Sequence, residues 1–247
     1  MSKQNIYDNE VFFEDYERIR SDKINFNDLI ETPILHSMLP KLQGKKVLDI
    51  GCGMGHHAKQ YSDMGAESVL GIDISEKMLN YAKEHNSAHN VAYVQMPLEE
   101  LSALQKKFDL VTSSLVFDYV ENLDVLFKDV YNLLNEDSEF VFSMSHPMAT
   151  AYDGTYPRYT RSASGKRLYA NINNYFVEGV RKVPWVVKDY ELYHRTVSSI
   201  INSIIQAGFE IASCKESQLP DEIRNRYPDT FGGTIHRPDF IFFRCRK

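Results

Sequence analysis

The sequence predicts an α/β fold in which helices cover both faces of a mostly parallel β-sheet. Short apolar runs of strand length alternate along the chain with segments whose apolar residues recur at helical spacing. This alternation is typical of βαβ units, because parallel strands are joined by crossover helices. A glycine cluster follows the first of these apolar runs and an acidic residue ends the second, a combination found where an α/β sheet binds a ligand.

The composition fits one large globular domain, or one domain that carries an insertion. The chain has 247 residues, of which 43% are hydrophobic and 25% charged, and this balance argues against disorder. Its three cysteines lie far apart without CxxC spacing, so we expect neither disulfides nor a zinc site. The formal net charge of −6, with scattered basic residues, argues against nucleic acid as a partner, since duplex binding needs clustered lysine and arginine.

The chain shows no pattern that targets it to a membrane. Its N-terminal residues are polar and do not form the apolar core of a signal peptide. No apolar run approaches the roughly 20 residues that cross a bilayer. We therefore expect a cytoplasmic protein without a membrane partner, and the sequence leaves its oligomeric state open.

The expected elements follow one another in a regular order after an N-terminal helical region. Apolar residues at helical spacing predict two or three helices within residues 9–40, with Pro33 where a new helix can begin. Ser75 can cap the helix that follows it, and Gly208 can end the last helix. We expect helices at 56–64, 75–85, 123–134 and 196–207, and strands at 46–50, 68–72, 91–94, 108–113, 139–145, from 209 onward and at 239–244.

Residues 147–195 interrupt this alternation. They are rich in Tyr, Gly, Pro and Asn and have few periodic apolar positions. A long irregular stretch is uncommon in a compact domain and is often a lid or a binding insertion. We therefore expect a helical N-terminal cover (1–40), an α/β domain (41–146 and 196–247) and a cap inserted between its two parts (147–195).

The strongest functional signal is the segment Val47–Gly55, which reads VLDIGCGMG. A strand delivers Asp49, and three glycines at alternate positions then turn the chain into a helix. Glycine is needed in such a loop because it accepts a positive φ and lets the backbone approach a ligand. Asp73 ends the next strand about 20 residues further on, where an acidic side chain can bind both hydroxyls of a ribose.

These residues resemble motif I and the following acidic motif of class I S-adenosylmethionine-dependent methyltransferases. The GxGxG spacing differs from the GxGxxG that is usual in nicotinamide enzymes, and a carboxylate at Asp49 would repel a pyrophosphate. The likeness covers nearly the whole chain and extends to a bacterial small-molecule methyltransferase subgroup. It implies a Rossmann-like three-layer sandwich with a seven-stranded, mostly parallel sheet, an antiparallel last strand, and S-adenosyl-L-methionine as cofactor.

The resemblance also implies which residues hold the cofactor. Asp49 would face its positively charged methionine end, Ser114 would lie beneath the methionine moiety, and Met96–Glu99 would grip adenine. Arg20 would pair with the cofactor carboxylate, with a solvent-facing position as the alternative. The expected set is Arg20, Asp49, Gly51, Gly53, Gly55, Asp73, Ile74, Met78, Met96, Pro97, Leu98, Glu99 and Ser114.

The residues expected at the methyl acceptor are less sharply defined. His146 follows the fifth strand at the carboxyl edge of the sheet and is the candidate catalytic base; its alternative role is to anchor the loop at Pro147. Asp118 stands where the subgroup commonly has a His before a Tyr, and a surface position is its alternative. The aromatic candidates can instead pack the cap, and His194 can anchor it. The expected acceptor pocket is Asp118, Tyr119, Tyr152, Tyr175, Phe176, Trp185 and His194.

The sequence thus predicts a transferase that moves a methyl group from S-adenosylmethionine to a small molecule. An O, N, S or C atom of the acceptor would attack the sulfonium methyl, and much of the acceleration would come from holding the two aligned. His56 and His57 are adjacent and point in different directions on a helix, so we expect no metal. The alternatives are a tRNA or protein methyltransferase, disfavoured by the acidic balance, and a non-catalytic cofactor-binding or regulatory protein.

Overall fold

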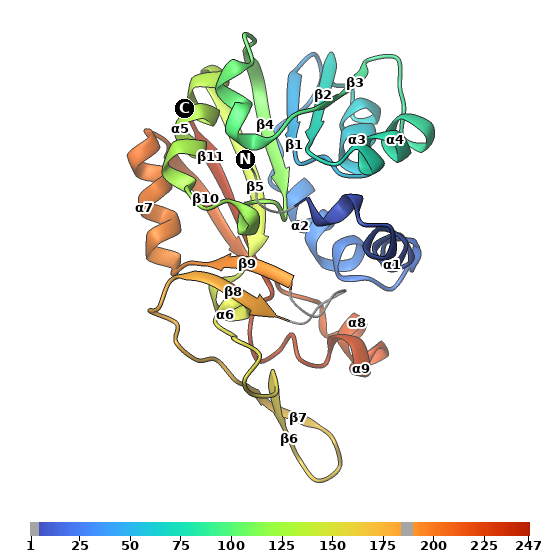
Figure 1. Ribbon diagram of the computed structural model, residues 1–247, viewed down its shortest axis with the longest axis vertical. Helices are drawn as coiled ribbons and strands as arrows, with labels where there is room; N and C mark the ends of the chain where they lie inside the picture. The colour runs from blue at the N-terminus through green and yellow to red at the C-terminus, as the bar shows by residue number, and fades with distance from the viewer. Residues whose placement is uncertain (1–4, 184–189) are drawn as a thin grey trace.

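Seven strands form one sheet in the computed structural model, which describes residues 5–183 and 190–247 (Figure 1). The strand order is β10-β11-β5-β4-β1-β2-β3. β11 runs antiparallel to both of its neighbours, and the other pairs are parallel. The predicted seven-stranded, mostly parallel sheet with an antiparallel last strand is therefore confirmed. The strands are β1 (Lys46–Ile50), β2 (Ser68–Asp73), β3 (Val91–Gln95), β4 (Phe108–Ser114), β5 (Leu134–Ser145), β10 (Glu210–Glu216) and β11 (Phe240–Arg246).

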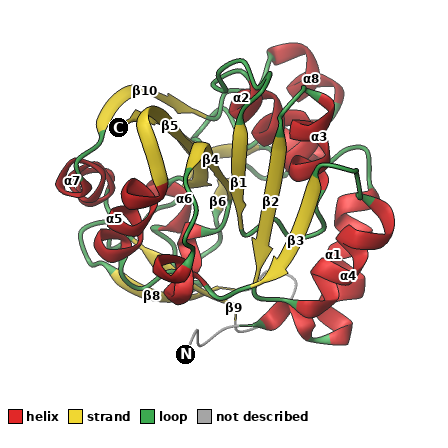
Figure 2. Cartoon of the chain, turned by 90° about the horizontal axis from the view of Figure 1, so that it is seen from above, coloured by secondary structure: helices red, strands yellow, loops and turns green. Residues whose placement is uncertain are grey.

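Helices cover both faces of this sheet. α5 (Leu123–Leu133) and α7 (Val197–Ala207) lie on one face, whereas α2 (Thr32–His36) and α3 (His56–Asp63) lie on the other (Figure 2). Each central strand feeds both layers, because successive side chains along a strand point to opposite faces. In β1, Val47 packs with the α2 and α3 side and Leu48 with the α5 and α7 side.

The helix ends follow the predicted capping residues. The Ser75 hydroxyl accepts from the Met78 amide at 3.1 Å at the start of α4 (Glu76–His85). Gly208 ends α7 with a φ of +107°, in the left-handed region that favours glycine. The N-terminal region holds η1 (Ile6–Asp8), α1 (Glu10–Ser21), η2 (Asn27–Glu31) and α2, which begins with Pro33 in its first turn.

The remaining short elements lie in the connections between strands. η3 (Leu98–Ala103) follows β3 and η4 (Phe117–Tyr119) follows β4. α8 (Asp221–Arg226) and α9 (Pro228–Phe231) lie between β10 and β11, where Phe231 packs against Ile30 of η2. None of the helices in the described part of the chain combines the length and the apolarity that a bilayer crossing would need.

The inserted segment is more regular than its composition suggests. After α6 (Pro147–Thr150) it forms two antiparallel hairpins, β6 (Tyr159–Arg161) with β7 (Arg167–Ala170) and β8 (Gly179–Val183) with β9 (Tyr190–His194). Alternate residues of β9 are buried, and Tyr190 and Leu192 pack with Phe12 of α1. Contacts with the N-terminal helices stabilise β8 and β9, and local periodicity does not report such contacts.

The aromatic cluster between the sheet and α5 should dominate the stability of the fold. Phe142 is fully buried and contacts the rings of Phe117, Phe127, Phe140 and Phe243. We expect Phe142→Ala to lower the free energy of unfolding by ~3–5 kcal/mol, since it removes a large side chain and leaves a cavity. Urea denaturation measures this loss, and Phe176→Ala is the matched control because Phe176 is 87% exposed. Equal effects of the two substitutions would contradict the assignment of this cluster as the core.

Candidate functional site

A cavity of about 1210 Å³ opens at the carboxyl edge of the sheet. The loops after β1, β2 and β4 form one side of it, and α1, η2 and the β8–β9 hairpin contribute to the other. Figure 1 shows α1 and this hairpin at the same end of the sheet. The strand order reverses between β1 and β4, which is where open α/β sheets bind ligands. The volume exceeds the range of about 300–1,000 Å³ that is common for a single small ligand.

The three glycines after β1 have different tasks. Their φ values are +66° at Gly51, +51° at Gly53 and +80° at Gly55, so the loop turns through the left-handed region. A Cβ on Gly51 would lie 2.3 Å from a methyl carbon of Val116, so this glycine is needed for packing. A Cβ on Gly53, whose φ is +51°, would meet no atom within 4 Å, because this residue faces the open cavity. Gly55 is the N-cap residue of α3 and, unlike Gly51 and Gly53, is not among the residues that line the cavity.

Asp73, at the end of β2, holds this loop in place. Its Oδ2 accepts a hydrogen bond from the Gly53 amide at 2.9 Å, and its Oδ1 accepts one from the Ser75 amide at 2.9 Å. Burial raises the pKa of Asp73, against the lowering effect of these amides. The predicted residues Ile74, Met78, Met96, Leu98 and Glu99 also line the cavity, whereas Pro97 does not.

Asp49, near the end of β1, lines the same cavity and carries a buried carboxylate oxygen without a partner among the described residues. Its side chain is buried, and its Oδ1 accepts from the Thr112 hydroxyl at 3.2 Å. Its Oδ2 has no hydrogen-bond partner among the described residues. Burial raises the pKa of Asp49 to about 6. A buried carboxylate with a free oxygen is suited to bind a cationic group, so the site fits the ammonium end of the expected cofactor.

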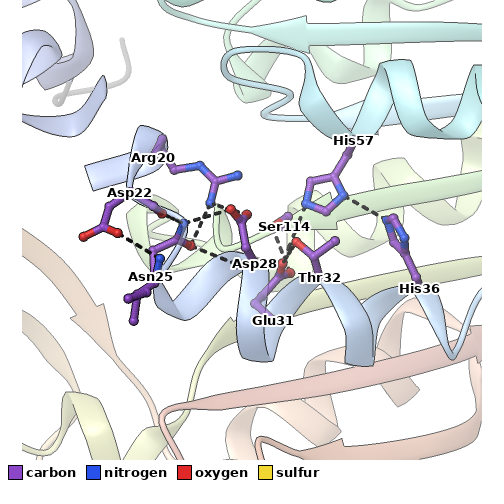
Figure 3. Close-up of polar contacts among 10 residues, drawn as sticks. Arg20, Asp22, Asn25, Asp28, Glu31, Thr32, His36, His57 and Ser114 are labelled. Carbon is purple, nitrogen blue, oxygen red and sulfur yellow. Dashed lines mark hydrogen bonds and ion pairs between the residues drawn. The ribbon is translucent and has the colours of Figure 1, made fainter. Parts of the chain in front are cut away.

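Arg20, on α1, points into the cavity and not to solvent. Its side chain is only 10% exposed, and its Nη1 donates to Asn25 Oδ1 at 3.4 Å and to Asp28 Oδ1 at 3.3 Å (Figure 3). These contacts use one nitrogen of the guanidinium, which carries five N–H donors in all. The position therefore fits the predicted pairing of Arg20 with a carboxylate ligand.

A buried network that the sequence did not predict lies beside these residues. Glu31 has no exposed surface, and its Oε1 accepts from the hydroxyls of Ser114 at 2.9 Å and Ser143 at 2.5 Å. Its Oε2 lies 3.6 Å from His57 Nε2, and His57 Nδ1 lies 3.2 Å from His36 Nε2 (Figure 3). Ser143 is 112 residues from Glu31 along the chain, so no local pattern could have indicated this cluster.

The charges of this network follow from its geometry. Burial would raise the pKa of Glu31, but the hydrogen bond and the charge of His57 outweigh it and lower that pKa. Burial would lower the pKa of His57, but Glu31 raises it, so the pair is a carboxylate and an imidazolium. Burial and the charge of His57 lower the pKa of His36 to about 4. His36 is therefore neutral, and its Nε2 accepts the proton that His57 Nδ1 donates.

Two of the predicted acceptor residues also line the cavity. Asp118 is buried, in contrast to the surface position that was its alternative. Its Oδ2 accepts from the Ser145 amide at 3.0 Å, and its Oδ1 has no hydrogen-bond partner among the described residues. Burial raises the pKa of this carboxyl group. The Tyr119 hydroxyl joins those of Tyr7, at 2.8 Å, and Tyr190, so it links η4 to the N-terminus and to β9.

His146, the candidate catalytic base, is held in a local hydrogen-bond network. It is buried, it caps α6, and it is not among the residues that line the cavity. Its Nδ1 accepts from the Met148 amide at 3.0 Å, and its Nε2 lies 2.9 Å from Glu216 Oε1. Since both ring nitrogens already have partners, this geometry favours the alternative role, in which His146 anchors the loop at Pro147.

The other acceptor candidates belong to the cap. His194 Nδ1 lies 2.7 Å from the Thr150 hydroxyl and its Nε2 lies 2.8 Å from the Tyr175 carbonyl, so this imidazole joins three parts of the cap. Tyr152 stacks under the Arg158 guanidinium, and Phe176 is exposed. The four candidates Tyr152, Tyr175, Phe176 and His194 are not among the residues that line the cavity. Trp185 lies outside the described residues.

Comparisons with known proteins agree with this geometry. A sequence profile described as a methyltransferase domain matches residues 48–142. The crystal structure of an S-adenosylmethionine-dependent methyltransferase from Mesorhizobium loti is 34% identical, covers 88% of this chain and 97% of its own, and has a TM-score of 0.78. A ubiquinone biosynthesis O-methyltransferase from Acinetobacter baylyi is 31% identical over 174 residues, which are 69% of this chain and 65% of that protein.

The buried Glu31–His57 pair should make stability depend on pH. The raised pKa of His57 stabilises the fold below its ordinary value of about 6.5, and this contribution is lost as the pH rises through the folded-state pKa. The lowered pKa of Glu31 stabilises the fold above its ordinary value, and this contribution is lost as the pH falls through the folded-state pKa. Both contributions are therefore present near pH 6, which lies between the ordinary pKa of glutamate, 4.5, and that of histidine, 6.5.

We expect Glu31→Gln to lower the free energy of unfolding by up to about 3 kcal/mol near pH 6, because it leaves a buried imidazolium uncompensated. The loss should shrink as the pH rises through the raised folded-state pKa of His57, because the imidazole loses its charge there. Urea denaturation over a series of pH values from about 6 upward measures it. Glu84→Gln is the control, since Glu84 lies 3.8 Å from His85 in an exposed pair. A pH-independent loss, or an equal loss in the control, would argue against the buried ion pair.

Proposed function

Because the chain belongs to the family of S-adenosylmethionine-dependent methyltransferases, we propose that it methylates a small-molecule acceptor held in the cavity described above. The observation that carries this proposal is the cavity itself, which reaches from the glycine loop to the cap side of the sheet. Its volume of about 1210 Å³ is larger than one small ligand needs, so cofactor and acceptor can lie side by side.

Residues around the glycine loop would hold the cofactor. We assign the ribose hydroxyls to Asp73, the ammonium group to Asp49 and the carboxylate to Arg20, with adenine near Met96 and Leu98. The free Oδ2 of Asp49 and the open space at Gly53 support this assignment. When bound, S-adenosylmethionine supplies a methyl group activated by a positively charged sulfur.

The chain itself would contribute alignment and proton handling. The cavity walls position the attacking atom of the acceptor and keep water away from the methyl group. Asp118 is the residue best placed to accept a hydrogen bond from an O–H or N–H nucleophile, because its Oδ1 is free and it lines the cavity. Burial raises the pKa of Asp118 toward neutral pH, and a carboxylate with a higher pKa is a better proton acceptor during the reaction. We therefore assign the role of catalytic base to Asp118 in place of His146.

Three further observations favour a small molecule over a macromolecule. The cavity lies under the cap hairpin β8–β9, whose Val183 and Leu192 line it, so the reacting end of the acceptor must fit within a limited space. The relative from Acinetobacter baylyi takes part in ubiquinone biosynthesis, by its name, and methylates oxygen. The formal net charge of −6 weakens the case for tRNA as a substrate.

Labelled methyl transfer tests the proposal directly. The purified protein is incubated with methyl-labelled S-adenosylmethionine and a metabolite extract, and we expect the label in a low-mass product that mass spectrometry can identify. Asp118→Asn should lower the rate of transfer by ~10–100-fold, since it removes a charged hydrogen-bond acceptor, and should keep cofactor affinity within about twofold. Its side-chain oxygen can still accept from the Ser145 amide, so the fold should persist.

Asp129→Asn is the matched control, because Asp129 also lines the cavity but lies on α5, away from the Asp118 contacts. It should leave the rate nearly unchanged. Label that appears only in tRNA or protein would overturn the small-molecule proposal. An unimpaired Asp118→Asn enzyme would remove Asp118 from the mechanism.

A second test concerns the glycine loop. Gly53→Val fills the open space that we assign to the cofactor, and it should abolish detectable binding of S-adenosylmethionine in calorimetry. Gly44→Val is the control for backbone strain, since Gly44 has a φ of +73° and its Cβ would also meet no atom within 4 Å. It should lose stability by ~1–3 kcal/mol but bind normally. Native affinity in Gly53→Val would mean that the cofactor lies elsewhere.

A further inference from the structure

A second group of charged residues lines the cavity away from the glycine loop. Arg158 belongs to the cap, and Arg237 and Asp239 precede β11. In the sheet, β11 is separated from β1 by β5 and β4. Neighbouring strands lie about 4.8 Å apart, so this group is roughly 14 Å from the glycine loop along the sheet edge. It lies on the β5 side, beyond the strand end that carries Asp118.

Positive charge is in excess at this place. Arg237 is 8% exposed, and its Nη2 lies 3.1 Å from Asp239 Oδ1. Arg158 donates only a long hydrogen bond of 3.4 Å to the Ala149 carbonyl among the contacts of the described residues, and it stacks on Tyr152. Burial lowers the pKa of Arg158, and repulsion from Arg237 lowers it further. Two guanidinium groups therefore share one nearby carboxylate.

A third arginine does not change this balance. Arg167 lies close enough to affect Asp239, but its Nη2 donates to the Asp229 carbonyl at 2.7 Å and it does not line the cavity as described. Arg158 and Arg237 are thus the arginines of this group that can reach a ligand. A buried and a half-buried guanidinium group without full compensation favour an anion, and their planar N–H pairs match the oxygens of a carboxylate or phosphate.

We propose that Arg158 and Arg237 bind an anionic group of the methyl acceptor, a carboxylate or a phosphate. This inference rests on the proposed function and names the substrate class of the same site. Tyr190 and Leu192 of β9 line the same cavity as the arginines and Asp118, so the body of the acceptor is aromatic or aliphatic. The acceptor is therefore an apolar molecule with one anionic end and a nucleophilic atom near Asp118.

The cofactor carboxylate is the rival occupant of these arginines. Arg20 already stands near the glycine loop, where it affects the pKa of His56. Arg158 and Arg237 lie beyond β4 and β5 from that loop, on the side where the acceptor should bind. A protein saturated with S-adenosylhomocysteine, the demethylated cofactor, separates the two possibilities.

Binding of simple probes to that saturated protein tests the inference without any methyl transfer. We expect benzoate or phenyl phosphate to bind ~10-fold more tightly than uncharged benzamide in calorimetric titrations, and the tighter of the two anions indicates carboxylate or phosphate. Arg158→Gln and Arg237→Gln should each weaken the anion by ~10-fold and leave benzamide and S-adenosylhomocysteine unchanged. Asp239→Asn is the matched control: it removes the negative charge next to Arg237 and should therefore increase the affinity for the anion.

Several results would overturn the inference. One is that neither anion binds, and another is that benzoate and benzamide bind with equal affinity. The inference is also wrong if neither arginine substitution changes the anion affinity, or if the anion competes with S-adenosylhomocysteine. The labelled transfer experiment fails or succeeds independently of these titrations. A labelled product without an anionic group would overturn this inference and leave the proposed function intact.

Discussion

A charged carboxylate that water cannot reach ties the N-terminal segment to the sheet. Glu31 has no exposed surface and lies among the hydroxyls of Ser114 on β4 and Ser143 on β5 and the imidazolium of His57 on α3. Burial of that charge without these partners would cost several kcal/mol. The N-terminal helices can therefore dock only where Glu31 meets all of them. The wall of the cavity that α1 supplies, including Arg20, depends on this docking.

The same network sets the charge next to the glycine loop. Burial raises the pKa of Asp49 to about 6, and the nearby charge of His57 lowers it. A carboxyl group that ionises near neutrality, with one oxygen unpaired, is prepared for a cationic ligand, whose charge would favour the ionised form. In our proposal the cavity is thus acidic around the cofactor and basic where Arg158 and Arg237 receive the acceptor. This division of charge would orient the two ligands relative to each other.

Two histidines fix the two ends of the cap by hydrogen bonds. His146 links the end of β5 to Glu216 of β10, and His194 links β9 to Thr150 of α6. Burial lowers the pKa of both imidazoles, so they are suited to fixed hydrogen bonds. The hydroxyl contacts of Tyr119 with Tyr7 and Tyr190 bring the N-terminus, η4 and the cap together at the cavity.

Local patterns in the amino-acid sequence were enough to predict the succession of strands and helices, the glycine loop and the acidic residue at the end of β2. Each of these is local: periodicity reports which face of an element is buried, and Gly51, Gly53 and Asp73 act through backbone turns and strand ends. The burial of Glu31 against residues up to 112 positions away depends on the packing of distant elements. So does the presence of Asp118, and not of His146, in the lining of the cavity. Residue type and spacing show that a side chain can carry out a reaction, but its direction and its partners depend on how distant elements pack.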